Sequence, residues 1–126
     1  MVEIEKLVAK YLRTRGVDRV ATNPGDAESP WVSVTLLDAP QTEGSSADRL
    51  VAHLLQLDCY AGSDGGQPEA VALAGSCREA LVEIADHDHD LGTVTAGRIN
   101  GMARIPDTGF EPARERVILT ATVWAY

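Results

Sequence analysis

The chain has 126 residues, of which 44% are hydrophobic and 24% are charged, and its formal net charge is −8. These values are ordinary for one soluble globular domain with a single core, so we predict one domain over residues 1–126. No apolar run approaches the ~20 residues that a membrane-spanning helix needs, and the first residues lack the basic and apolar segments of a secretion signal. The sequence therefore predicts a cytoplasmic protein without membrane contact.

The charge is spread unevenly along the chain. Residues 1–20 carry five basic and three acidic side chains, residues 21–90 carry two and thirteen, and residues 91–126 carry four and three. A sequence-specific nucleic-acid binder needs a basic stripe that neutralises phosphates, so this pattern argues against one. An acidic surface would let DNA slide past without sticking, although plain solubility is the simpler explanation.

The first half of the chain predicts one helix and two clear strands. A helix is predicted over residues 2–15, because its apolar residues recur at helical spacing and Gly16 is a suitable C-terminal stop. These apolar residues are Ile4, Leu7, Val8, Tyr11 and Leu12. The next predicted segments are a short extended stretch at 18–22, a turn at 23–26, a strand at 31–37, a loop at 38–48 and a long strand at 49–60.

The second half predicts another helix and a β-hairpin. A Gly-rich turn at 61–67 leads into a helix at 68–84, with Pro68 in its first turn. The apolar stripe of this helix is formed by Ala70, Leu73, Ala74, Cys77, Leu81 and Ile84. After a closing segment at 86–90, the chain continues as a strand at 94–104, a turn at 105–113 and a final antiparallel strand at 114–126.

The final strand is apolar on both faces. Its two rows are Val117, Leu119, Ala121, Val123 and Ala125, and Ile118, Thr120, Thr122, Trp124 and Tyr126. A period of two with β-branched and aromatic residues is typical of a strand, and an apolar outer row needs a neighbour to cover it. We expect the row that contains Trp124 to contact a second subunit or another protein. The alternative is that a helix of the same chain covers this row and the other row faces outward.

The predicted order of elements is α-β-β-α-β-β, with a short extra strand possible after the first helix. Two amphipathic helices must cover one face of a mainly antiparallel sheet of four to five strands. This arrangement predicts the α+β class, built as a two-layer sandwich.

The segment Asp86–Asp90 contains two histidines and three aspartates in alternation. These are metal-ligand types, but a structural or catalytic site needs three or four convergent ligands, and His53 is the other histidine of the chain. A solvated helix end, where histidine near the last carbonyls is mildly favourable, is the simpler interpretation. A metal-dependent enzyme that uses this segment is the competing one.

The two cysteines, Cys59 and Cys77, each fall on the apolar face of a predicted element. We expect buried thiols, placed so that they could meet between the helix and the sheet. A catalytic cysteine would need a lowered thiol pKa and a nearby base, and the sequence signals neither.

Four arginines gather on the last predicted hairpin: Arg98, Arg104, Arg114 and Arg116. Because the middle of the chain is acidic, we expect these arginines to form ion pairs with an acidic neighbouring subunit. Contact with DNA and ordinary surface charge are the alternative interpretations.

The order and spacing of four pieces resemble the tail terminator, or tail completion, proteins of long-tailed phages and prophages. The pieces are the helix followed by 21–24, the proline-led strand 30–34, the strand end 55–62 before a helix with Glu69-Ala70 near its start, and the run from Gly101 through 105–107 and Pro112 to 116–119. The resemblance covers the whole chain. It implies a virion structural protein, found in the tail at the head–tail junction and in the host cytoplasm during assembly.

Proteins of this family form a ring, usually a hexamer, that caps the head-proximal end of the tail tube. The ring stops tube polymerisation and provides the surface that joins the head, and DNA passes through its central hole. The resemblance therefore implies three partners: further copies of the same chain, the major tail tube protein, and a head completion or connector protein. It implies no active site, cofactor or metal ion. A stopper or adaptor protein of the same neck region is the alternative.

Overall fold

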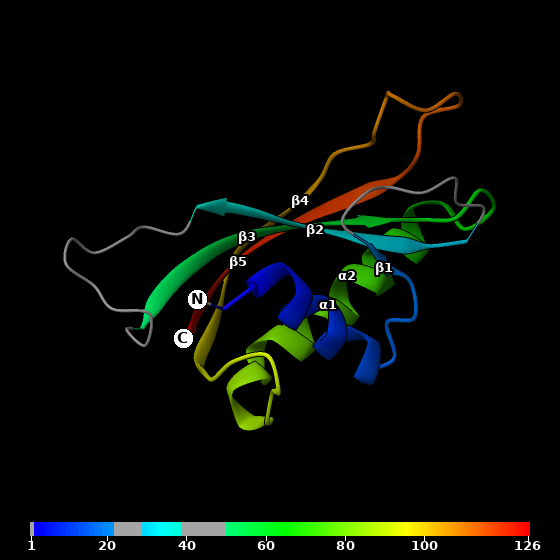
Figure 1. Ribbon diagram of the computed structural model, residues 1–126. Coiled ribbons are helices and arrows are strands. Elements are labelled where there is room, and N and C mark those ends of the chain that lie inside the picture. The colour runs from blue at the N-terminus through cyan, green and yellow to red at the C-terminus, as the bar shows by residue number, and fades with distance from the viewer. Residues whose placement is uncertain (1, 22–28, 39–49) are drawn as a thin grey trace.

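The computed structural model describes residues 2–21, 29–38 and 50–126 (Figure 1). The turn predicted at 23–26 and the part of the predicted loop beyond Asp38 lie outside these residues. The elements are α1 (Ile4–Thr14), β1 (Val20–Ala21), β2 (Trp31–Asp38), β3 (Val51–Tyr60), α2 (Gly66–Val82), the 3-10 helix η1 (Ile84–Asp86), β4 (Val94–Arg104) and β5 (Arg116–Ala125).

The sheet has five strands in the order β1-β2-β3-β5-β4. All neighbouring strands are antiparallel except β1, which pairs parallel with β2. Helices α1 and α2 lie on the same side of the sheet, α1 against β1 and β2, and α2 against β3, β5 and β4 (Figure 1). The predicted α+β two-layer sandwich is confirmed.

Several predicted boundaries were wrong by a few residues. Helix α1 begins at Ile4 and ends at Thr14, and α2 begins at Gly66 and gives way to η1 after Val82. Strand β2 includes Asp38, because a bulge after Leu36 lets the strand pair one residue further with β3. Strand β3 begins at Val51.

The final strand is shorter than predicted at both ends. It begins at Arg116 and ends at Ala125. Arg114 pairs only as an isolated bridge with Asp107, and Tyr126 exchanges backbone hydrogen bonds with Thr93 beyond the end of the strand. Pairing with β4 therefore continues past both ends of β5, but less regularly.

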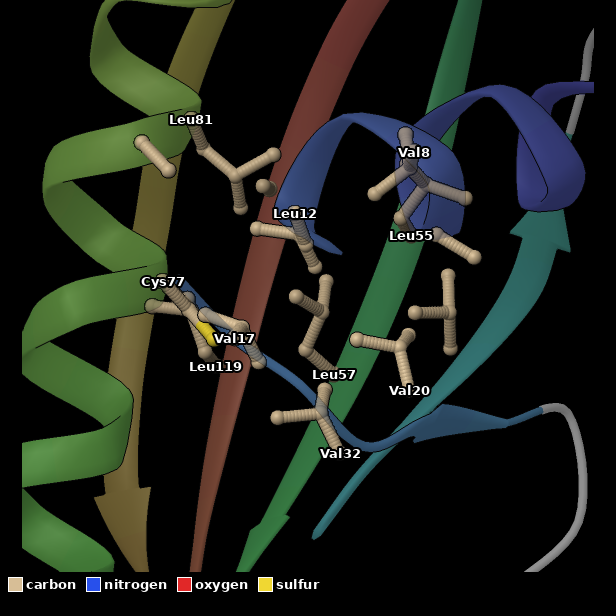
Figure 2. Close-up of a cluster of buried hydrophobic side chains, with 14 of the residues drawn as sticks. Val8, Leu12, Val17, Val20, Val32, Leu55, Leu57, Cys77, Leu81 and Leu119 are labelled. Atoms are coloured by element: carbon tan, nitrogen blue, oxygen red, sulfur yellow. The ribbon is translucent and has the colours of Figure 1, made fainter. Parts of the chain in front are cut away.

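The core lies between the helices and one face of the sheet, and Figure 2 shows side chains from both layers meeting there. Leu7 and Leu12 of α1 and Leu81 of α2 are buried against this face. Strand β5 contributes Val117, Leu119, Ala121, Val123 and Ala125 to the core. The alternative in which this row faces outward is therefore wrong, and the row that contains Trp124 lies on the face away from the helices.

A close approach of α2 to β4 depends on one glycine. A Cβ atom added at Gly97 would lie 2.4 Å from the carbonyl oxygen of Leu81 and 2.6 Å from Cγ2 of Ile84. The C-terminal end of α2 and the start of η1 thus rest directly on the backbone of β4.

Among the described residues, no helix is long and apolar enough to cross a membrane.

Candidate subunit interface

The face of the sheet away from the helices, called here the open face, is covered by no helix of the described chain. On β5 it presents Ile118, Thr120, Thr122, Trp124 and, just after the strand, Tyr126. Thr122 is buried by its neighbours, Ile118, Thr120 and Trp124 are partly buried, and Tyr126 is 43% exposed. This strand therefore places apolar and aromatic side chains on a face that no helix of the described chain covers.

Polar contacts organise one end of the open face. The guanidinium of Arg98 lies over the ring of Trp124, with its carbon 5.5 Å from the ring centre. Arg98 Nε donates to Asn100 Oδ1 at 3.2 Å, and Asn100 Nδ2 donates to Thr122 Oγ1 at 2.9 Å. A cation over an aromatic face is weakly attractive and orders both groups. Arg98 therefore belongs to the same surface as Trp124.

An aromatic cluster occupies the other end of the open face. Trp31 of β2 stacks on Tyr60 of β3 with ring centres 4.2 Å apart, and Phe110 packs edge-on against both rings at 6.0 Å. Trp31 and Tyr60 are buried although no helix covers them, because the segment between β4 and β5 folds over them. Sequence reasoning missed this cluster, since its three rings come from distant segments.

Three of the four predicted interface arginines have partners within the chain. Arg116 faces Asp107 at 3.5 Å and Asp58 at 3.9 Å, and Arg104 Nε contacts Glu115 Oε2 at 3.4 Å. The guanidinium of Arg114 lies over the Phe110 ring with its carbon 5.8 Å from the ring centre. Their charges are thus partly used to hold the hairpin end, and Arg98 lies apart from them.

Asp107 ties the segment between β4 and β5 to the aromatic cluster. It accepts hydrogen bonds from the Gly109 backbone N–H at 2.9 Å and from the Tyr60 hydroxyl at 2.8 Å. The Gly109 bond, with help from Tyr60 and from the charge of Arg116, lowers the pKa of Asp107 below its ordinary 3.8. Burial, reinforced by the bond to Asp107, raises the pKa of Tyr60 to about 12.

The low pKa of Asp107 predicts a stability contribution that depends on pH. A carboxyl group whose folded-state pKa is lowered stabilises the fold above its ordinary pKa of 3.8 and loses this effect as the pH falls through the folded-state value. Near neutral pH we expect Asp107→Asn to lower the unfolding free energy by on the order of 1 kcal/mol. Urea titrations of both proteins from about pH 6 to about pH 2.5 should show this difference shrinking in acid. A difference that stays constant would contradict the assignment.

The histidines of the Asp86–Asp90 segment face α1. His87 Nε2 accepts a hydrogen bond from Arg15 at 2.7 Å, and His89 Nε2 donates to the Ile84 carbonyl at 2.8 Å. Both rings lie near Tyr11, with ring centres 5.4 Å and 5.2 Å from it. Within the described ranges, no group of three or more His, Cys, Asp or Glu side chains lies close enough to hold a metal ion.

The predicted meeting of the two cysteines is confirmed. Cys59 and Cys77 are both buried and carry free thiols. A hydrogen bond with Cys77, followed by burial, raises the pKa of the Cys59 thiol well above its ordinary value. A thiol in this state is a poor nucleophile, because the thiolate is the reactive form.

The comparisons with known proteins add no relative. No protein-family model matches the chain, and no curated protein matches it.

Proposed function

We propose that the protein is a tail terminator of a long-tailed phage or prophage. It assembles as a ring, of six copies if it follows the family, that caps the head-proximal end of the tail tube and stops tube polymerisation. The ring then provides the surface to which a head completion or connector protein joins. The observation that carries the proposal is the open face of β5, where Trp124 and Ile118 lie on an inner strand of the sheet that no helix of the described chain covers on this side.

Two further observations support a structural role in assembly. The five-stranded sheet with two helices on one side is the α+β class that the resemblance to tail terminators implies. The strongly acidic residues 21–90 suit a ring through which DNA passes without sticking, because like charges repel.

The sharpest test of this proposal is Trp124→Asp. A charged side chain in the centre of a buried contact should weaken assembly by about thirtyfold or more, which corresponds to at least ~2 kcal/mol. The measurement is tube capping by the purified protein with the major tail tube protein, scored by electron microscopy, beside circular dichroism to check the fold. Normal capping and particle assembly by Trp124→Asp would show that the open face of β5 contacts neither the tail tube nor a neighbouring subunit.

A matched control is Val71→Asp, which places the same charge on the exposed side of α2. Val71 is 47% exposed and lies on the opposite side of the sheet from Trp124, so capping should be unchanged.

Imaging of the protein with tails also distinguishes a tail terminator from a stopper or adaptor protein. Protein found on the end of the tube supports a terminator, whereas protein found only on the portal side would identify a stopper or adaptor.

A further inference from the structure

In the part of the chain that the structure describes, both edges of the sheet leave backbone groups without a strand partner. Strand β4 pairs with β5 and with no other strand of the described chain, and its far half, Gly101–Arg104, is exposed. At the other edge, β1 pairs with β2 only at Val32 and Ser33. Within the described ranges, no strand pairs with residues 34–38 on the side of β2 that faces away from β3. Such free edges are ready templates for a strand of another chain.

On β4, the ladder with β5 fixes which amides point outward. The Ile105 N–H donates to the Arg116 carbonyl at 3.0 Å, so this amide turns toward β5. Hydrogen-bonded positions alternate along an antiparallel pair. The Ala103 amide therefore also turns toward β5, and the Met102 amide turns toward the free edge.

On β2, the same reasoning applies from the opposite side. The Val32 N–H donates to the Arg19 carbonyl at 2.9 Å, which places this amide on the side away from β3. By alternation, the Val34 amide also points away from β3, toward the unpaired part of the edge. Both edges thus offer outward-pointing donors.

The two edges are in register across the sheet. One row of paired residues is Gly101, Thr120, Gln56 and Thr35, and another is Arg98, Thr122, Leu54 and Asp38. Between these rows both edge strands contain a bulge, so each has two residues where β3 and β5 have one. The edges therefore match residue for residue between the rows.

Strand direction and charge favour a second copy as the partner of this edge. The successive antiparallel pairs make β2 and β4 run in opposite directions, so a copy laid edge to edge presents its β2 antiparallel to β4. In the shared register, Asp38 of that copy lies beside Arg98. Strand β4 carries Arg98 and Arg104 with no acidic residue, whereas β2 carries Asp38 with no basic residue.

We infer that β4 of one copy pairs antiparallel with 34–38 of β2 in the next copy. The contact joins two different edges, so it repeats head to tail and closes into a ring when the rotation between copies permits. The sheets of the subunits then form one continuous sheet around the ring. This inference rests on the proposed ring and names the contact that holds it together.

Bulges and charged residues such as those of β4 also protect an edge strand from unwanted pairing. Protection alone does not explain why β2 and β4, at opposite edges, each have a bulge between the same two rows of paired residues. Because of these bulges, both strands have the same number of residues between the rows, as two strands that pair with each other require.

Disulfide cross-linking tests the contact directly. Thr35 and Gly101 would be directly opposite at a position where antiparallel Cα atoms are ~4.5 Å apart, which suits a disulfide. A Cβ atom at Gly101 meets nothing closer than Thr120 Oγ1 at 3.8 Å, and the natural Cys59 and Cys77 are buried. Under mild oxidation, the variant with both Thr35→Cys and Gly101→Cys should form covalent oligomers.

The single-cysteine variants decide which edges meet. Each of Thr35→Cys and Gly101→Cys alone should stay at least about tenfold less cross-linked than an equal mixture of the two, which should give covalent dimers and nothing larger. Efficient dimers of Gly101→Cys alone would show that β4 meets β4 across a two-fold axis. That result, or a mixture that stays monomeric, would overturn the inference.

A proline at the outward amide separates this contact from the proposed function. Met102→Pro removes an N–H that β5 does not use, and proline is tolerated at such edge positions. We expect a folded monomer by circular dichroism with cross-linking and rings lost, whereas Met102→Thr should keep both. Rings that persist in Met102→Pro would overturn the edge contact and leave tube capping standing. Cross-linked oligomers of a protein that never caps tubes would overturn the terminator role alone.

Discussion

Replacing Gly97 with valine should lower the unfolding free energy by about 3 kcal/mol. The first added carbon would lie 2.4 Å from the Leu81 carbonyl oxygen, which belongs to helix backbone and has little freedom to move. Helix α2 would have to lift from β4, and the packing of Ile84 against the sheet would be lost with it. Urea unfolding, followed by circular dichroism, measures the change.

Gly75→Ala is the matched control for this prediction. Gly75 lies within α2, and an added Cβ there meets nothing within 4 Å. Alanine should therefore stabilise the helix by up to ~0.8 kcal/mol, because it is a better helix former than glycine. If Gly97→Val proved as stable as the natural protein, α2 could not lie as close to β4 as described.

Leu57→Ala should cost about 3 kcal/mol, because it removes a fully buried side chain from the centre of the sheet. Leu57 points toward the helices, where Figure 2 shows it among core side chains from α1, β2 and β5. The cavity left by the missing carbons cannot collapse easily between a rigid sheet and two helices. Chemical unfolding of the variant gives the free energy directly.

The neighbouring Leu54 provides the comparison within the same strand. It lies on the open face, opposite Thr122, and is only partly buried. Leu54→Ala should therefore cost no more than ~1 kcal/mol in the isolated chain. Equal losses for the two variants would mean that both faces of the sheet are packed alike, contrary to the two-layer arrangement.

Much of the fold could be predicted because strands and helices have different periods. The alternation in residues 116–125 and the spacing of Leu7, Val8 and Leu12 are local patterns that survive folding. Boundaries were less predictable, because pairing decides them. Aspartate is a residue type that favours turns, so the sequence predicts a loop that begins at Asp38, but a bulge keeps Asp38 paired in the sheet.

The side of β5 that faces the helices could not be decided from the sequence. Both of its rows are apolar, so the period of two predicts a strand but does not show which row faces the helices. The small residues Ala121 and Ala125 lie under the helices, and the large Trp124 lies on the open face. A prediction based on side-chain size alone would bury Trp124 under the helices and place the two alanines on the open face.

The predicted interface residues were only partly brought together by the fold. Arg98 contacts the ring of Trp124, but Arg104 and Arg116 form ion pairs within their own chain. A sequence shows the charge of an arginine without showing its nearest carboxylate. Glu115 is close in sequence to Arg116 and yet contacts Arg104 across the hairpin.

The position of β5 also constrains how the chain reaches its fold during synthesis. This strand lies inside the sheet, between β3 and β4, and pairs Cys59 with Val117 and Val51 with Ala125. Strand β3 therefore waits for residues made much later, and until then it can pair only with β2. Such distant contacts slow folding and leave strand edges open to other chains. The sheet can be completed only after residues 116–125 have left the ribosome.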